Sequence, residues 1–248
     1  MASDEKYRFH IEDLSAAAWP AELSAAEAHH AMHVLRLAAG AEVELFDGRG
    51  RRAAARIASA RHGHVSVEPA GAVQSRPRPG PPVHLAFAVP KGKRMDWLLE
   101  KATELGAASL RPVVFERSVA GEELSAAKRQ RWQTHCIAAA KQCGLDFLPE
   151  LLEPVELAQL AQAHAGGPAE ALALVGDLAE SALGLPRALA SWRADQPVLI
   201  VVGPEGGLTG QERQTLAAAA FVPVRLGQTV LRIETAALAL LAAVTAMR

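Results

Sequence analysis

Cysteine, aromatic side chains and net charge are all scarce in this chain. Of its 248 residues only Cys136 and Cys143 are cysteines, aromatic residues make up 4%, and the formal net charge is −1. The two cysteines lie in a helical stretch without a Cys-x-x-Cys motif, which argues against a disulfide framework or a metal site and favours buried thiols. We therefore expect a reducing compartment, the cytoplasm. The near-zero charge argues against a uniformly basic nucleic-acid binder.

Long hydrophobic runs are also missing. The longest one, at 236–247, is too short to cross a bilayer and fits a core helix. Residues 1–6 contain no apolar segment of the kind that forms the core of a secretion signal. Half of all residues are nonetheless hydrophobic, which is enough for a substantial core. We expect a soluble protein with no membrane partner.

A proline-rich stretch divides the chain. Residues 74–82 read Gln-Ser-Arg-Pro-Arg-Pro-Gly-Pro-Pro, which cannot continue a helix or a central strand. This composition predicts a semi-rigid linker over 75–82, between one domain at 1–74 and another at 83–248.

The residues before the linker predict a small β-rich domain with one helix. The helix is expected from Ser24 to about Leu37, because Ser24 and Glu27 have the spacing of a capping box. His29 and His33 share a face of this helix, but no carboxylate or cysteine completes a metal site, so no metal is expected. The expected strands, from their alternating pattern, are 43–46, 53–57 and 64–67.

The residues after the linker predict an α/β domain, because apolar runs alternate with helical patterns around what should be a largely parallel sheet. The expected strands are 83–89, 108–115, 148–152, 171–175, 198–202 and 222–226. The expected helices are 95–105, 125–142, 155–164, 210–220 and 234–247. Ligands of such a domain bind at the carboxyl ends of the strands.

Two glycine-containing segments fall at those strand ends. The first reads Val-Gly-Pro-Glu-Gly-Gly-Leu-Thr at 202–209, and the second reads Leu-Gly-Gln-Thr-Val-Leu-Arg-Ile-Glu-Thr-Ala at 226–236. Thr209 and Glu212 have capping-box spacing for a helix that follows the first. Neither the G-x-G-x-x-G spacing of dinucleotide sites nor the lysine of a phosphate-binding loop is present. The first segment alone fits a plain tight turn, but the second favours two halves of one small-molecule pocket.

G-P-E-G-G followed by L-G-x-x-x-L-R-x-E-T-A resembles the RsmE-type branch of the SPOUT methyltransferases, which methylate N3 of a uridine in small-subunit ribosomal RNA. The resemblance extends over nearly the whole chain. It implies a SPOUT-type α/β domain with a C-terminal trefoil knot, preceded by a small PUA-like RNA-binding domain, and a homodimer. Other segments that resemble the family lie at 33–37, Gly40, 45–48, 91–95, 100–106, 116–118 and 132–144.

The resemblance also implies the cofactor S-adenosylmethionine, held mainly by backbone groups. Glycines suit such a site because side chains there would occupy the space of the ligand. The positions that match the family's cofactor site are Leu174, Gly176, Val202, Gly203, Pro204, Glu205, Gly206, Gly207, Leu226, Gly227 and Leu231.

Two residues of the second segment are candidates for catalysis. Uridine N3 carries a proton at neutral pH, so an enzyme must accept that proton or stabilise the uridine anion. Arg232 is expected to hold a uridine oxygen as a fixed cation, because its guanidinium never acts as a base. Glu234 is expected either to accept the proton or merely to cap the last helix, where a carboxylate is favoured anyway.

Clustered cations predict an RNA-binding face. The middle of the chain, 76–149, has more cations than anions, and the arginines between 49 and 61 have no acid among them. The family's Glu and Arg in the segment around Gln142 are Lys141 and Leu145 here, so any role of that arginine is absent. The expected partner is ribosomal RNA, naked or in the assembled small subunit. The expected RNA contacts are Arg36, Arg49, Arg51, Arg52, Lys91, Lys93, Arg94 and Gln142.

Two alternative functions stay open. One is methylation of a ribose 2′-hydroxyl in transfer or ribosomal RNA by the same fold. The Leu-Arg-Ile-Glu-Thr-Ala sequence speaks against it, because ribose methylators of this superfamily more often carry Ser and Asn there. The other is a non-catalytic RNA-binding or ribosome-assembly module, against which the intact glycines and Arg232 speak.

Overall fold

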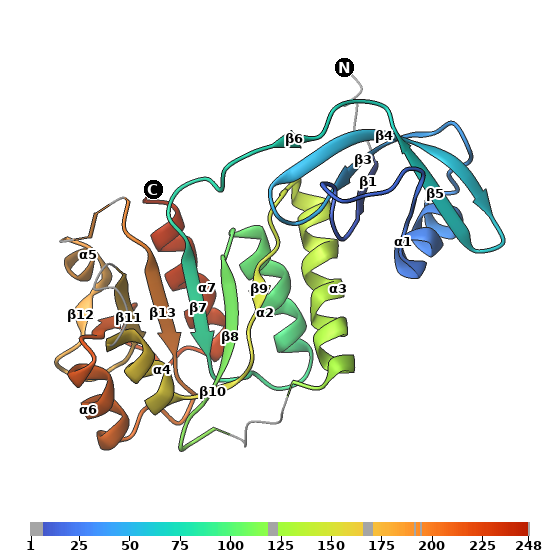
Figure 1. Cartoon of the computed structure of the whole chain (residues 1–248). Coiled ribbons are helices and arrows are strands. Elements are labelled where there is room, and N and C mark those ends of the chain that lie inside the picture. Colours follow the sequence, from blue (N-terminus) through green and yellow to red (C-terminus); the bar gives the residue numbers. More distant parts are fainter. Residues whose placement is uncertain (1–6, 119–123, 166–170, 191, 194, 248) are drawn as a thin grey trace. The chain divides into compact units, whose positions relative to one another are not determined.

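The computed structural model describes residues 7–118, 124–165, 171–190, 192–193 and 195–247 (Figure 1). The first six residues, for which no secretion signal is expected, lie outside these ranges. The chain forms two compact units, one of residues 1–78 with 140–148 and one of 79–139 with 149–248. None of the described helices is long and apolar enough to cross a membrane.

The first unit is built on a six-stranded sheet of order β1-β3-β4-β5-β2, with β6 paired to β4. The three strands expected from the sequence are confirmed as β3, β4 and β5. Alternate residues of β4 (Ala53, Ala55 and Ile57) are buried, as a half-buried strand requires. The strand bounds are β1 Tyr7–His10, β2 Ala21–Glu22, β3 Glu42–Phe46, β4 Arg51–Arg61, β5 His64–Pro69 and β6 Gln74–Ser75.

The single helix expected from Ser24 to Leu37 is wrong in its length and regularity. α1 (Ala25–His29) passes into a widened π-helical turn, η1 (His30–Val34), and Arg36 then adopts a φ of 55°, which ends the helix. The Ser24 hydroxyl accepts a hydrogen bond from the Glu27 N–H at 3.3 Å, as a cap should. The Glu27 carboxylate does not return the contact, because it accepts the His10 N–H at 3.0 Å and binds Lys141 at 2.9 Å instead.

Residues 140–148 belong to the first unit, and the buried side chain of Arg8 on β1 binds them there. Its guanidinium donates to the carbonyls of Ala140 and Leu145 at 3.1 and 3.2 Å and to the Asp146 carboxylate at 2.5 Å. The side chains of Arg8 and Asp146 are only 9% and 7% exposed. This arginine therefore neutralises a buried carboxylate and satisfies the carbonyls at the end of a helix.

The second unit is an α/β domain, and the eight strands among its described residues are all paired in parallel, as expected. The strand order is β10-β8-β7-β13-β11-β14-β12, with β9 paired to β8. Its central strands are apolar on both faces, which suits strands covered on both sides. The bounds are β7 Val83–Phe87, β8 Ser109–Val114, β9 Glu150–Leu151, β10 Val155–Glu156, β11 Leu172–Gly176, β12 Leu183–Gly184, β13 Val198–Val202 and β14 Val222–Arg225.

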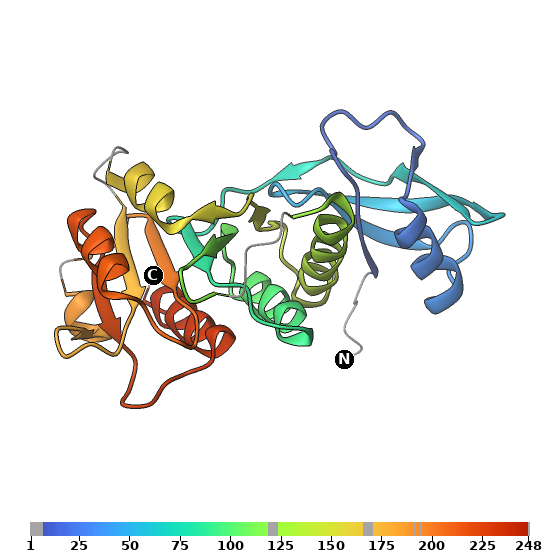
Figure 2. The ribbon, with the colours of Figure 1, turned by 90° about the horizontal axis from the view of Figure 1, so that it is seen from below.

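Five helices of this unit were expected, and the short α5 was not. α2 and α7 lie side by side on one face of the sheet, while α4 lies on the other and contacts α6 (Figures 1 and 2). The helix expected at 155–164 begins later, because Val155 and Glu156 pair with β8 as β10. The bounds are α2 Lys93–Glu104, α3 Ala126–Cys143, α4 Leu157–Ala165, α5 Leu185–Ala188, α6 Gly210–Ala218 and α7 Ile233–Thr245.

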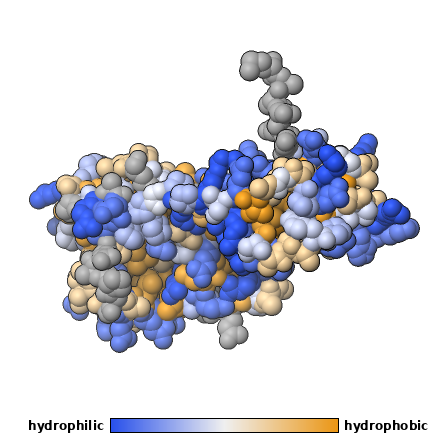
Figure 3. Space-filling model, turned by 45° about the horizontal axis from the view of Figure 1, so that its top comes forward, coloured by the Kyte–Doolittle hydropathy of each residue, from blue (hydrophilic) through white to orange (hydrophobic). Residues whose placement is uncertain are grey.

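The resemblance-based trefoil knot stays a prediction, since strand order alone does not define the threading of the chain. The molecular face drawn in Figure 3 is mainly hydrophilic, with apolar side chains gathered in smaller areas. Among the large apolar side chains that remain exposed are Trp97, Leu178 and Val230.

The two cysteines differ in burial, although both were expected to be buried. Cys136 is 2% exposed and Cys143, the last residue of α3, is exposed. Burial raises the pKa of the Cys136 thiol to about 11. We expect iodoacetamide to modify Cys143 at neutral pH and to leave Cys136 intact until the protein unfolds, because the thiolate is the reactive form. Intact-mass analysis checks this, and rapid addition of two adducts to the native protein would contradict it.

Candidate active site

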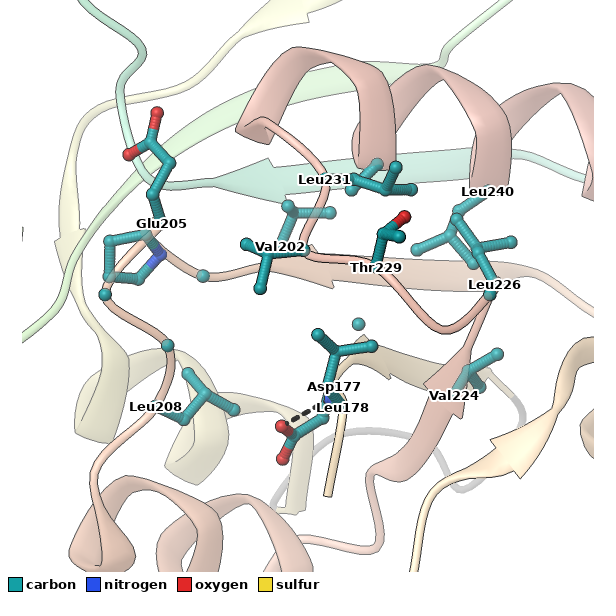
Figure 4. A pocket seen from close by; sticks show the side chains of 18 of the residues that line it. Asp177, Leu178, Val202, Glu205, Leu208, Val224, Leu226, Thr229, Leu231 and Leu240 are labelled. Atoms are coloured by element: carbon teal, nitrogen blue, oxygen red, sulfur yellow. Dashed lines mark hydrogen bonds between the residues drawn. The ribbon is translucent and has the colours of Figure 1, made fainter. Parts of the chain in front are cut away.

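Three loops meet where strands of the second unit end. The loops follow β11, β13 and β14, and because neighbouring parallel strands end at one edge of a sheet, the loops lie together. They enclose a cavity of about 240 Å³ (Figure 4). Its lining residues are Gly176, Asp177, Leu178, 202–208, Arg213, Val224, Leu226, Gly227, 229–231, Ala236 and Leu240.

The loop after β13 is held in shape by contacts from two sides. The Thr209–Glu212 capping box is confirmed, with the Glu212 carboxylate accepting the Thr209 N–H at 2.7 Å. The same carboxylate accepts the N–H of Glu116 at 2.9 Å, and Arg117 donates to the carbonyl of Gly206 at 2.8 Å. The side chain of Arg117 thus connects the segment at 116–118 to the loop that lines the cavity, a connection that the sequence could not show.

Glycine is required in this loop for two reasons. A Cβ at Gly203 would lie 2.9 Å from Cδ2 of the buried Leu208, and Gly207 has a φ of +71°. A side chain at Gly203 would therefore require Leu208 to shift, and a side chain at Gly207 would be strained.

The loop after β14 offers free backbone groups to a ligand. Counting partners only within the described ranges, the N–H and C=O groups of 227–231 make no hydrogen bond. A Cβ added to Gly227 would meet no atom within 4 Å. Figure 4 shows Thr229 and Leu231 on one side of the cavity, across from Leu208 and Asp177. Unpaired backbone groups beside an apolar hollow are suited to a ligand with both polar and apolar parts.

The opposite wall carries an ion pair that sequence analysis missed. Arg213 on α6 donates to both oxygens of Asp177 at 2.7 and 3.0 Å. Burial alone would raise the pKa of the Asp177 carboxyl, but Arg213 and the N–H groups of Leu178 and Ala179 hold this pKa below its ordinary value. No pattern links residues this far apart in sequence, so only the fold brings them together.

The two candidate catalytic residues lie at the start of α7 with different exposure. Arg232 is the N-cap residue and is exposed, and within the described residues its guanidinium has no hydrogen-bond or ion-pair partner. Glu234 is 5% exposed, and its Oε2 atom is buried and has no hydrogen-bond partner among the residues that the structure describes. Its Oε1 atom lies 3.9 Å from Nε of Arg94. Among the described residues, its carboxylate therefore forms no capping hydrogen bond.

The structure brings together ten of the eleven residues expected to bind the cofactor, all of which line the cavity. Leu174 does not line it, because this residue lies in β11 and is 0% exposed in the core. Lining residues that were not expected include Asp177, Leu208, Arg213 and Val230. Val230, which is 67% exposed, lies within the glycine-containing segment at 226–236. Arg213 lies a few residues after the segment at 202–209.

The residues expected to bind RNA fall in both units. Arg36, Arg49 and Gln142 are exposed in the first unit, and Lys91, Lys93 and Arg94 are exposed in the second.

Four of the expected RNA contacts lie close to acids of their own unit. Arg49 lies 3.5 Å from Asp13, and Arg94 lies 3.7 Å from Glu205 and 3.9 Å from Glu234. Arg51 lies 3.1 Å from both Asp13 and Asp47, and Arg52 lies 3.8 Å from Glu44. Within the described residues, no group of three or more His, Cys, Asp or Glu side chains is placed to hold a metal ion.

Comparison with known families defines the class of protein. The model of the RNA methyltransferase domain matches residues 77–245, and the model of the RNA methyltransferase PUA domain matches residues 23–70. The chain belongs to the ribosomal RNA small subunit methyltransferase E family of RNA methyltransferases.

Relatives of that name match nearly the full chain. The protein of this name from Synechocystis sp. is 32% identical over 91% of this chain and 72% of its own length, and the one from Mycobacterium bovis is 31% identical over 95% and 90%. A solved putative methyltransferase from Legionella pneumophila, in complex with the bound cofactor SAM, has a TM-score of 0.85, 31% identity and 98% coverage of both chains. The Neisseria gonorrhoeae ribosomal RNA small subunit methyltransferase E, bound to S-adenosyl methionine, has a TM-score of 0.81, 29% identity and the same coverage.

Proposed function

We propose that this protein transfers the methyl group of S-adenosylmethionine to N3 of a uridine in small-subunit ribosomal RNA. The observation that carries the proposal is the cavity formed by the two glycine segments, in a chain whose relatives are named for this class of reaction. The Leu-Arg-Ile-Glu-Thr-Ala sequence supports the base rather than the ribose as target.

The residues of the cavity fit the proposed cofactor. The apolar side chains of Val202, Leu226 and Leu231 suit an adenine ring, and the unpaired backbone groups of 227–231 suit its polar edge. Asp177 offers a charged acceptor on the opposite wall. When bound, S-adenosylmethionine supplies an electrophilic methyl group, so the protein has to supply position and electrostatics.

The proposed roles of the protein's own groups follow from their placement. Glu234 accepts the N3 proton directly or through water, since its carboxylate makes no hydrogen bond to a described residue. Arg232 donates to a uridine carbonyl oxygen and stabilises the negative charge that develops there, because its guanidinium is permanently charged. With the cofactor bound, its methyl group would be supplied to N3, and the carboxylate of Glu234 would keep the proton.

The proposal is tested by calorimetry and by methyl transfer with the purified chain. S-adenosylmethionine should bind, and labelled methyl should appear in small-subunit ribosomal RNA presented either naked or in the assembled subunit. Absence of binding at millimolar cofactor would favour the non-catalytic alternative. Label in ribose 2′-oxygens would instead favour the ribose methyltransferase.

Further parts of the proposal concern assembly and substrate contact. The protein is a cytoplasmic homodimer with a trefoil-knotted second unit, supported by its family membership. Light scattering measures the dimer. The RNA phosphates are contacted by Arg36, Arg49, Lys91, Lys93 and Gln142, supported by their exposure. Arg51 and Arg52 contribute to the same electrostatic field.

A substitution at Gly227 separates cofactor binding from folding. Because a Cβ there meets open space, Gly227→Val should leave the melting temperature within a few degrees of the original. The new side chain occupies ligand space, so S-adenosylmethionine affinity should fall by a factor on the order of 100, equivalent to about 3 kcal/mol. Calorimetry measures this loss. The matched control is Gly184→Val, which also meets open space but lies outside the cavity lining, and equal affinity for both variants would contradict the placement of the site.

A further inference from the structure

The cavity combines a buried apolar floor with a charged, partly exposed wall. Val202, Val224 and Leu240 belong to the floor and are at most 4% exposed. Arg213 also lines the cavity, but its side chain is 43% exposed, so it lies at the edge that faces solvent. Among the lining residues, all of which the structure describes, Arg213 is the one cation. A ligand with an anionic end therefore has a single cationic side chain to meet in this cavity.

Asp177 holds the guanidinium of Arg213 in a fixed orientation. Its Oδ2 accepts a hydrogen bond from Nε of Arg213 at 2.7 Å, and its Oδ1 accepts one from Nη2 at 3.0 Å. The Asp177 side chain is itself only 7% exposed, and its Oδ1 also accepts the N–H groups of Leu178 and Ala179 at 2.8 and 3.3 Å. Two parallel hydrogen bonds along one edge prevent the planar guanidinium from rotating.

The opposite edge of the same guanidinium is left for a ligand. An arginine side chain has five N–H donors, and Asp177 takes two of them. Within the described residues Arg213 has no further hydrogen-bond partner, so both N–H groups of Nη1 and one of Nη2 remain. Donors on these two neighbouring nitrogens form a fork, which is the arrangement that binds a carboxylate through both of its oxygens.

We propose that Arg213, oriented by Asp177, binds the carboxylate of the amino-acid part of S-adenosylmethionine. This inference rests on the proposed function, and it assigns a residue to the one anionic group of that cofactor. The other charged lining residues, Asp177 and Glu205, are acids and repel a carboxylate. In Figure 4 the Glu205 side chain also points away from the other labelled side chains of the cavity. Neither Asp177 nor Arg213 lies in the glycine segments at 202–209 and 226–236, so no motif indicated this contact.

The test compares two ligands that differ only in this group, S-adenosylmethionine and its decarboxylated form, by calorimetry with the full chain. The wild type should bind the carboxylated ligand more tightly by a factor on the order of 10 to 100, the usual range for hydrogen bonds to a charged group. In Arg213→Gln the preference should fall to about threefold, since a neutral amide offers only an ordinary hydrogen bond. Arg213→Lys should show an intermediate preference, because it keeps the charge and loses the fork.

Arg187→Gln is the matched control. It removes an exposed arginine of α5 that does not line the cavity, and it should keep the wild-type preference. Thermal melting checks that each variant is folded. Arg213→Lys retains a cation beside Asp177, so it carries the comparison if Arg213→Gln melts early.

Two results would overturn the inference. In the first, Arg213→Gln loses affinity for both ligands by the same factor, which would mean that Arg213 only braces the wall. In the second, the wild type does not distinguish the two ligands, which would mean that the protein does not recognise the carboxylate. Failure of the proposed function is separate, since a chain that keeps the ligand preference but transfers no methyl group to RNA would contradict that function and leave the role of Arg213 standing.

Discussion

Glu234→Gln will reduce kcat for uridine methylation by a factor on the order of 10² to 10⁴, the usual contribution of a general base. The glutamine side chain has the same shape but cannot accept the N3 proton. Cofactor affinity should be unchanged, because Glu234 is not among the residues that line the cavity. The deficit should shrink at alkaline pH, where uridine N3 loses its proton without help. Single-turnover methylation as a function of pH measures both effects.

The matched control for this substitution is Glu104→Gln. Glu104 is also a helical glutamate, but it pairs with Lys101 at 2.8 Å and does not line the cavity. Its replacement should leave kcat within about twofold, since exposed ion pairs contribute little. If Glu234→Gln retained full activity at neutral pH, Glu234 would be a structural residue and the proton would leave by another route.

Arg8→Met will lower the free energy of unfolding of the first unit by about 3–5 kcal/mol, the usual result of breaking a buried ion pair by removing one partner. The substitution leaves the Asp146 carboxylate buried without its cation, and it removes the hydrogen bonds to the carbonyls of Ala140 and Leu145. Glu44 also loses a partner, since Nε of Arg8 lies 2.8 Å from its Oε1 as an ion pair without an aligned hydrogen bond. Urea denaturation, followed by a probe in the first unit, measures the loss.

A second variant shows whether the buried charge causes the loss. Arg8→Met combined with Asp146→Asn should recover part of the stability, because the uncompensated charge is then removed. Arg52→Met, which removes a more exposed arginine of the same unit, should cost at most about 1 kcal/mol. If Arg8→Met cost no more stability than Arg52→Met, Arg8 would not be the connection between β1 and 140–148.

The sequence predicted the second unit well, because local signals and tertiary structure agree there. Alternating apolar runs and helices define the parallel sheet, and Thr209 and Glu212 define the start of α6. The sequence predicted both glycine motifs at the carboxyl ends of strands, where ligands of α/β domains bind. The structure brings their residues to one cavity. Resemblance to a family supplied the cofactor and the reaction, which no periodicity shows.

The features that the sequence did not predict depend on side chains distant in sequence. Glu27 has the spacing of a capping box, but its carboxylate binds Lys141 and the His10 N–H instead of the start of its own helix. The Asp177–Arg213 pair and the placement of 140–148 with the first unit likewise arise from long-range contacts. Leu174 was expected at the cofactor because it lies near the end of its strand, but β11 is buried on both faces and the Leu174 side chain is 0% exposed.

Mass spectrometry of small-subunit ribosomal RNA from cells with and without this chain tests the proposed function most directly. We expect one N3-methylated uridine to disappear on deletion and to return when purified protein and S-adenosylmethionine are added, and not to return with Glu234→Gln. If that uridine stays methylated while a ribose methyl group or a transfer-RNA mark disappears, the assignment of the uridine base as substrate is wrong.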